Sequence, residues 1–167
     1  MNIFFLSLNA VTCAMMYCDQ HVIKILLEIV QMLYTAHDQN FVLAEAPFNK
    51  ARTRRGYRPA HKNHPMCKWV RSSREAYQMA VNIGTALALE YNYRFGKIHA
   101  CSIHILWLSM NPPKTFEKFV SLDSDRGIPE CMPDEHKDPD IVKAYKSYYL
   151  TKTFGRFTKR SPTLNDI

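Results

Sequence analysis

The sequence predicts an all-α protein that folds as one compact domain, and three observations support this prediction. The chain has 167 residues and a mass of 19.5 kDa, which is typical of one domain. Its 47% hydrophobic and 22% charged residues exclude a disordered or collagen-like chain. Apolar residues recur at helical spacing over two long stretches. We therefore expect residues 1–167 to form two long and two shorter helices, joined by irregular, Pro-rich connections.

The first half of the chain predicts one long helix and a loop. Residues 2–6 are apolar and fit either a short strand or a tucked-in terminus. Helical periodicity then runs from about Asn9, an N-cap residue type, as far as His37. Residues 38–62 contain two prolines, a glycine and many basic residues, and we expect a basic loop there.

The second half predicts the other three helices. A long helix begins near Pro65, with Asn63 or His64 as its cap, and ends at Gly96. Residues 99–110 predict a shorter, mostly buried helix that Asn111 and two prolines end. Residues 111–138 look irregular. Asp138 and Pro139 fit the N-cap and first position of a last helix up to residue 150, and residues 151–167 form a basic tail.

The net charge of +7 is concentrated in one segment. Residues 50–74 contain nine basic residues and no acid, which leaves 13 basic and 15 acidic residues elsewhere. A concentrated cationic segment indicates a polyanionic partner, most simply double-stranded DNA. The alternative is a solubilising surface or a disordered loop.

One stripe of the first helix predicts a functional site. His21, Lys24, Glu28, Gln31 and Thr35 follow one another at intervals of three or four residues and share a face, while apolar residues occupy most of the remaining circumference. Polar groups on a buried helix are costly unless they are paired. A carboxylate beside His and Lys suits general acid–base chemistry or the stabilisation of a cation. The alternative is a structural Lys24–Glu28 ion pair with a partly buried His21.

Basic and aromatic residues interleave in and after the cationic segment, a composition that suits phosphate contacts and stacking on bases. Some of these aromatics, Trp69 among them, would equally fit the core. The candidate DNA-binding residues are Arg52, Arg54, Arg55, Arg58, His61, His64, Lys68, Trp69, Arg71, Arg74, Arg94, Lys97, Tyr145 and Tyr148.

The cysteines and the N-terminus indicate the compartment. Five cysteines without regular spacing favour reduced thiols inside a cell. The apolar N-terminus has no basic residue before Lys24, so we expect neither a signal peptide nor secretion. No segment has the length and apolarity of a membrane span, and we expect no membrane partner. Cys and His spacings around residues 18–21 and 61–67 do not match known zinc modules, so no metal or other cofactor is expected.

Several motifs carry a family resemblance. CD-x-H-x-x-K-x-x-x-E, TAH, H-x-NHP and EY-x-x-R-x-GK-x-H occur here as residues 18–28, 35–37, 61–65 and 90–99. With these motifs the chain resembles, over nearly its whole length, a group of small phage and bacterial proteins that begin Met-Asn-Ile-Phe. Through shorter motifs, above all Glu28 seven residues after His21, it resembles the phage-type pyrimidine-dimer DNA glycosylases of the endonuclease V type.

The resemblance implies base excision. In that family an N-terminal α-amine attacks C1′ of the damaged nucleotide and forms a Schiff base, and the acid stabilises the sugar cation and assists strand cleavage. Glu28 would then be the catalytic carboxylate, His21 and Lys24 would support it, and Met1 or Lys24 would supply the amine. This chain departs from the family because Asn2 is large enough to favour retention of Met1.

We therefore expect a DNA-processing enzyme of the glycosylase or glycosylase/lyase type that acts on damaged or modified bases. The alternative is a non-enzymatic viral or phage protein that binds or packages nucleic acid. A metal-dependent nuclease or base-modifying enzyme is a third hypothesis.

Overall fold

The computed structural model describes residues 1–117, 127–152 and 155–160. The prediction of an all-α single domain is confirmed, with the helices more finely divided than expected. One isolated bridge joins Phe48 and Arg55. The α-helices of the described residues are α1 (Ala10–Met16), α2 (Asp19–Thr35), α3 (Gln39–Glu45), α4 (Pro65–Ser72), α5 (Arg74–Phe95), α6 (Ser102–Met110) and α7 (Ile141–Leu150), and a 3-10 turn, η1 (Asp134–His136), precedes α7.

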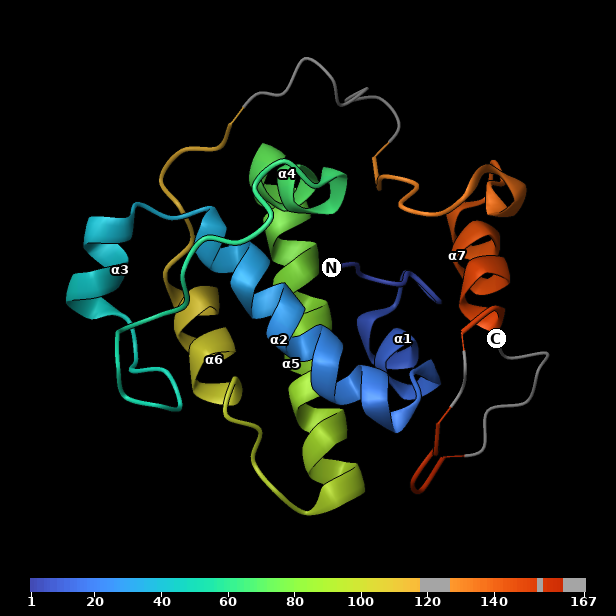
Figure 1. Cartoon of the computed structure of the whole chain (residues 1–167), viewed down its shortest axis with the longest axis horizontal. Helices are drawn as coiled ribbons and strands as arrows, with labels where there is room; N and C mark the ends of the chain where they lie inside the picture. Colours follow the sequence, from blue (N-terminus) through green and yellow to red (C-terminus); the bar gives the residue numbers. More distant parts are fainter. Residues whose placement is uncertain (118–126, 153–154, 161–167) are drawn as a thin grey trace.

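The long helix α5 forms the centre of the fold, and α1, α2, α4 and α6 all pack against it (Figure 1). The helices pack closely at Gly84. A Cβ atom there would lie 2.7 Å from Ile105 on α6 and 3.1 Å from Ile29 on α2. Glycine at this position therefore lets three helices meet at one point.

The first predicted helix is in fact two helices, which corrects the expected span of Asn9 to His37. Asn9 does cap α1, because its side chain accepts a hydrogen bond from the Thr12 amide. The backbone then becomes extended at Tyr17 and Cys18 before α2 begins. Arg94 of α5 donates hydrogen bonds to the carbonyls of Met15 and Tyr17. A buried guanidinium thus satisfies backbone groups that the break leaves unpaired.

The second predicted helix is also divided. His64 caps α4 by accepting from the Met66 amide, as one of the two predicted caps. The helix stops at Ser73, whose backbone is extended and whose hydroxyl caps α5 through the Ala76 amide. α5 ends at Gly96 as predicted, and this glycine has a φ of 64°.

Three further boundaries differ from the prediction. Residues 38–62 are not only a loop, because Asp38 caps α3 within them. α6 begins at Ser102 rather than at residue 99. α7 is capped by Asp140 rather than Asp138, since the Asp140 carboxylate accepts from the amides of Val142 and Lys143. Residues 118–126 of the Pro-rich connection, and 153–154 and 161–167 of the predicted tail, lie outside the described residues.

The N-terminal segment is tucked into the core, where Ile3, Phe4, Phe5 and Leu6 are buried. The Phe4 backbone is held by the Tyr17 hydroxyl, which accepts from its amide and donates to its carbonyl. Within the described part of the chain, no helix combines the length and apolarity needed to cross a membrane.

Candidate active site

The stripe carboxylate Glu28 lies beside the first two residues of the chain. The backbone amide of Asn2 donates a 2.9 Å hydrogen bond to Glu28 Oε2, and the Met1 amino group is 3.9 Å from the same oxygen. Lys24 Nζ lies 3.8 Å from Oε1. The Glu28 side chain is 12% exposed, whereas Lys24 is 64% exposed. We call Met1, Asn2, Lys24 and Glu28 the amine cluster.

The side chain of Asn2 holds the start of the chain in this position. Asn2 Nδ2 donates to the carbonyl of Cys131, in the connection before α7. The other amide atom, Asn2 Oδ1, is buried without a hydrogen-bond partner in the structure. A side chain that anchors its own backbone in this way limits the movement of the amino group next to Glu28.

His64, at the start of α4, is close enough to the amine cluster to respond to its charge. Burial lowers the pKa of His64, the positive charges of the N-terminal amine and His61 lower it further, and Glu28 opposes them. The lowered pKa keeps this imidazole neutral at neutral pH. Its Nδ1 accepts from the Met66 amide, so Nε2 is the ring nitrogen that can exchange a proton.

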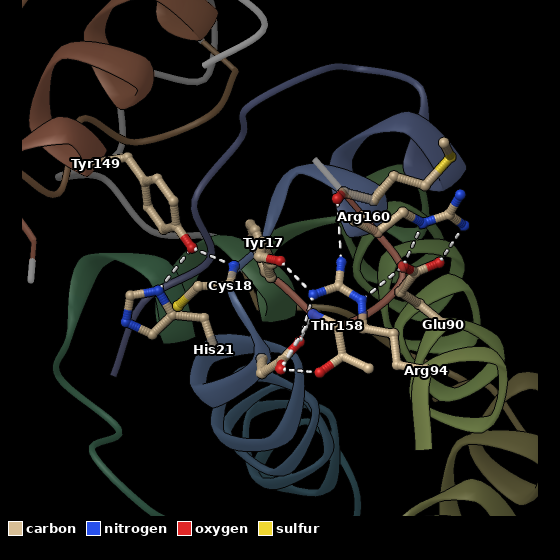
Figure 2. Close-up of polar contacts among 10 residues, drawn as sticks. Tyr17, Cys18, His21, Glu90, Arg94, Tyr149, Thr158 and Arg160 are labelled. Carbon is tan, nitrogen blue, oxygen red and sulfur yellow. Dashed lines mark hydrogen bonds and ion pairs between the residues drawn. The ribbon is translucent and has the colours of Figure 1, made fainter. Parts of the chain in front are cut away.

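His21 occupies a different environment from Lys24 and Glu28 although all three share the stripe. Its Nδ1 lies 2.7 Å from the Tyr149 hydroxyl of α7, and its ring stacks on Phe4 with centroids 5.5 Å apart. The Tyr149 hydroxyl also accepts from the Cys18 amide (Figure 2). The structure thus brings Lys24, Glu28 and Met1 together and places His21 where it links α2 to α7.

The same contacts act on the Cys18 thiol. Burial raises its pKa, but hydrogen bonds with His21 and Tyr149 outweigh this effect and lower the pKa to about 7. The side chain is completely buried. We therefore regard Cys18 as part of the α2–α7 junction.

A second polar cluster lies on the other side of Tyr17 and is mostly buried (Figure 2). Arg94 forms ion pairs of 2.9 Å with Asp19 and 2.7 Å with Glu90. Arg160, from the tail, binds both oxygens of Glu90 at 2.8 Å. Thr158 donates to Asp19 through its amide and its hydroxyl. We call Asp19, Glu90, Arg94 and Arg160 the arginine cluster.

Four predicted DNA-binding residues lie in the interior, which corrects the interpretation that their side chains face a ligand. Arg94 belongs to the arginine cluster, and Arg71 pairs with Glu117. Trp69 packs edge-on against Phe5, and the Tyr145 hydroxyl donates to the Pro129 carbonyl. Their exposed fractions are 6% or less, so these side chains contact other residues of the protein and stabilise its core.

The other predicted DNA-binding residues remain at least partly exposed, which keeps them available as candidates. Most of them form two groups in the fold, one within residues 47–55 and the other from Arg58 onto α4, while Arg74, Lys97 and Tyr148 lie outside both groups. The residues are Arg52, Arg54, Arg55, Arg58, His61, His64, Lys68, Arg74, Lys97 and Tyr148. Ala60, within the second group, is held against α2 because its amide donates to the Thr35 hydroxyl.

The sequence did not predict that Asn2, Cys131 or Tyr149 would contact the residues of the stripe. Cys131 and Tyr149 are far from the stripe in sequence, and no local pattern indicates that they contact it. Asp19 and Glu90 were recognised only as motif positions. For Glu90 the sequence did contain one signal of an ion pair, because Glu90 and Arg94 are four residues apart on the same helix.

Within residues 1–117, 127–152 and 155–160, no three His, Cys, Asp or Glu side chains are arranged to hold a metal ion. No family model, curated protein or solved structure matches this chain.

Proposed function

We propose that this protein is a DNA-processing enzyme of the glycosylase/lyase type, similar to the phage-type pyrimidine-dimer glycosylases. The observation that carries the proposal is the Met1 amino group 3.9 Å from the Glu28 carboxylate. The amine and the acid are 27 residues apart in the sequence, and the fold brings them together. An amine paired with a carboxylate is the minimum needed for Schiff-base chemistry at a sugar carbon.

In the proposed reaction, the unprotonated amine attacks C1′ and the base departs with the electrons of the glycosidic bond. Glu28 stabilises the positive charge that develops on the sugar. The nitrogen then loses a proton and the C1′–O4′ bond breaks. Its electron pair goes to O4′, which takes up a proton, and the protonated Schiff base forms at C1′. Removal of a C2′ proton expels the 3′ phosphate and cleaves the strand.

His64 is suited to accept the proton that the amine loses. It is neutral at neutral pH, and the amine's charge acts on its pKa. Lys24 is the alternative amine, since its Nζ is also near Glu28. The exposed basic residues from Arg58 onto α4 would contact phosphates beside the site.

The experiment is to incubate the full chain with ultraviolet-damaged and base-modified duplex DNA in borohydride. A Schiff base is reduced to a stable protein–DNA adduct, so a trapped adduct together with strand cleavage supports the proposal. Absence of both, on every substrate, would remove the lyase mechanism.

A non-enzymatic nucleic-acid-binding protein is the second candidate. The observation that favours it is that both Glu28 oxygens already have partners, Asn2 on one and Lys24 on the other. A purely structural anchor would need no more. This alternative predicts salt-sensitive binding that does not distinguish damaged from intact DNA, and no adduct.

A further inference from the structure

The Phe48 hairpin (residues 47–55), which overlaps the start of the cationic segment, is an ordered structure. The Phe48–Arg55 bridge closes it, and the Asn49 amide donates to the Arg54 carbonyl. Inside the turn, the Asn49 side chain exchanges hydrogen bonds with Thr53. Arg52 has a φ of 55°, a left-handed conformation that the turn imposes on a residue other than glycine.

The hairpin is anchored on the protein by its two ends. Arg55 donates to the Ala46 carbonyl, and the Gly56 amide donates to the Pro47 carbonyl. Gly56 itself lies against Val42 and Tyr34, with no room for a side chain. Figure 1 shows this stretch of chain directly after α3, away from the N-terminus that carries the amine cluster.

A cavity of about 850 Å³ elsewhere is lined mostly by apolar residues, but the cavity at the hairpin has a different character. It has a volume of about 770 Å³ and is lined by Pro47, Phe48, Asn49, Lys50, Arg52, Arg55 and Ile103. Three of these residues are cations and none is an acid. Phe48 and Ile103 are 50% and 58% exposed, so aromatic and aliphatic surface faces the same space.

The hairpin cations differ in how they are used. Arg55 is held over the Phe48 ring, 4.5 Å from its centroid, which fixes the ring in place. Lys50 is exposed, and it acts on a neighbouring group, because its charge adds to burial in lowering the pKa of His99. Arg52 is exposed as well. The site therefore combines a fixed, half-exposed ring with cations at the solvent face.

We propose that the Phe48 hairpin binds single-stranded nucleic acid, with a base stacked on Phe48 and the neighbouring phosphates held by Lys50 and Arg52. Unpaired bases offer the flat faces that such a ring needs, whereas bases within a duplex are stacked on one another. The absence of acidic lining residues complements a polyanion. This site rests on the proposed nucleic-acid substrate and is independent of the chemistry at Glu28.

Fluorescence anisotropy with a labelled oligothymidylate and a duplex of equal length tests the site on the full chain. Phe48→Ala should weaken single-strand binding about 5- to 100-fold. Phe48→Trp should retain binding and Phe48→Leu should not, since the ring is the required feature. The matched control is Phe41→Ala, because Phe41 is 42% exposed but lies on α3 beside Trp107.

The cations are tested by the salt dependence of the same binding. Lys50→Gln and Arg52→Gln should each reduce the slope of log K against log salt by about 0.7. Lys114→Gln, an exposed lysine elsewhere, should leave the slope unchanged.

Equal effects of Phe48→Ala and Phe41→Ala would overturn the proposal. So would a preference for duplex that survives Phe48→Ala, or stronger hairpin-dependent binding to anionic vesicles than to oligonucleotide. Borohydride trapping keeps the two proposals separate. If Phe48→Ala forms adducts equally well on single-stranded and duplex substrates, the proposed function stands and the hairpin site is wrong. If binding depends on the hairpin but no adduct forms, the hairpin site stands and the lyase mechanism is wrong.

Discussion

The amine cluster and the arginine cluster both place carboxylates on helices in the interior of the fold, but they use them differently. In the arginine cluster, ion pairs of 2.7–2.9 Å satisfy Asp19 and Glu90 with buried or partly buried partners. In the amine cluster, the two charged nitrogens are 3.8 and 3.9 Å from Glu28, and one of them belongs to an exposed lysine. The first arrangement is a closed structural network. The second is a looser arrangement, in which one of the two nitrogens is on an exposed side chain.

The largest expected effect concerns Glu28. Glu28→Gln keeps the size of the side chain and its bond from Asn2 but removes the charge that would stabilise the sugar cation. Adduct formation with borohydride should fall about 10²- to 10⁴-fold, while DNA binding and the urea midpoint change little. An unchanged trapping rate would show that Glu28 belongs with the structural carboxylates.

Arg94→Met should cause the largest loss of stability. It leaves Asp19 and Glu90 with fewer partners and frees the carbonyls at the α1–α2 break, so we expect a cost of about 3–5 kcal/mol. Urea unfolding followed by circular dichroism measures it. Arg74→Met, at an exposed position, is the control and should stay within about 0.5 kcal/mol of the natural protein. A similarly small change for Arg94→Met would contradict a closed network.

The arginine cluster also predicts how stability depends on pH. Burial raises the pKa of Asp19, but hydrogen bonds from Thr158 and Arg94 outweigh it and hold the pKa below its usual 3.8. Burial also raises the pKa of Glu90, but hydrogen bonds from Arg160 and Arg94 outweigh it and hold the pKa below its usual 4.5. Each carboxylate therefore stabilises the fold above its unfolded pKa, and this contribution is lost as pH falls through the folded pKa.

Urea midpoints from about pH 7 to about pH 3 test this sign. The natural protein should lose stability across the acidic range, and Asp19→Asn should lose less over the same range because one of the linked groups is gone. Asp134→Asn is the matched control, since the Asp134–Lys137 pair is exposed to solvent. If Asp19→Asn and Asp134→Asn gave parallel pH profiles, the linkage to Asp19 would be wrong.

The smallest effect is expected at the tail. Arg160→Gln removes an ion pair whose arginine is 25% exposed, and should cost about 1 kcal/mol or less. Faster hydrogen exchange at the Thr158 amide would report the loosened tail. Arg156→Gln should not change it, because this residue contacts α2 through its backbone carbonyl. Equal exchange in both variants would show that the Glu90–Arg160 pair does not hold the tail.

The sequence was sufficient for the fold class because helical periodicity and caps are local properties. Asn9 and His64 cap the starts of α1 and α4, and Gly96 follows the end of α5, as the sequence predicts. The breaks at Cys18 and Ser73 were missed because apolar spacing continues across both. The first of them depends on Arg94, which is 77 residues from Tyr17 in sequence.

The candidate site was predicted only in part for the same reason. The stripe correctly brought Lys24 and Glu28 together, since one helix face is a local feature. The positions of Met1 and Asn2 depend on Cys131 and on the packing of Phe4, and these contacts join distant segments. Charge alone also grouped residues that the fold separates, because Arg71 and Arg94 are buried while Arg52 is exposed.

Mass spectrometry of the trapped protein–DNA adduct tests the central claim most directly, because it identifies the residue that supplied the amine. Intact mass establishes the first residue of the protein used, and peptide mapping locates the reduced sugar. We expect the adduct on the peptide that begins with the N-terminal amine, and we expect Lys24→Gln to retain it. An adduct on Lys24, or none on any damaged or modified duplex, would contradict the assignment of the N-terminal amine beside Glu28.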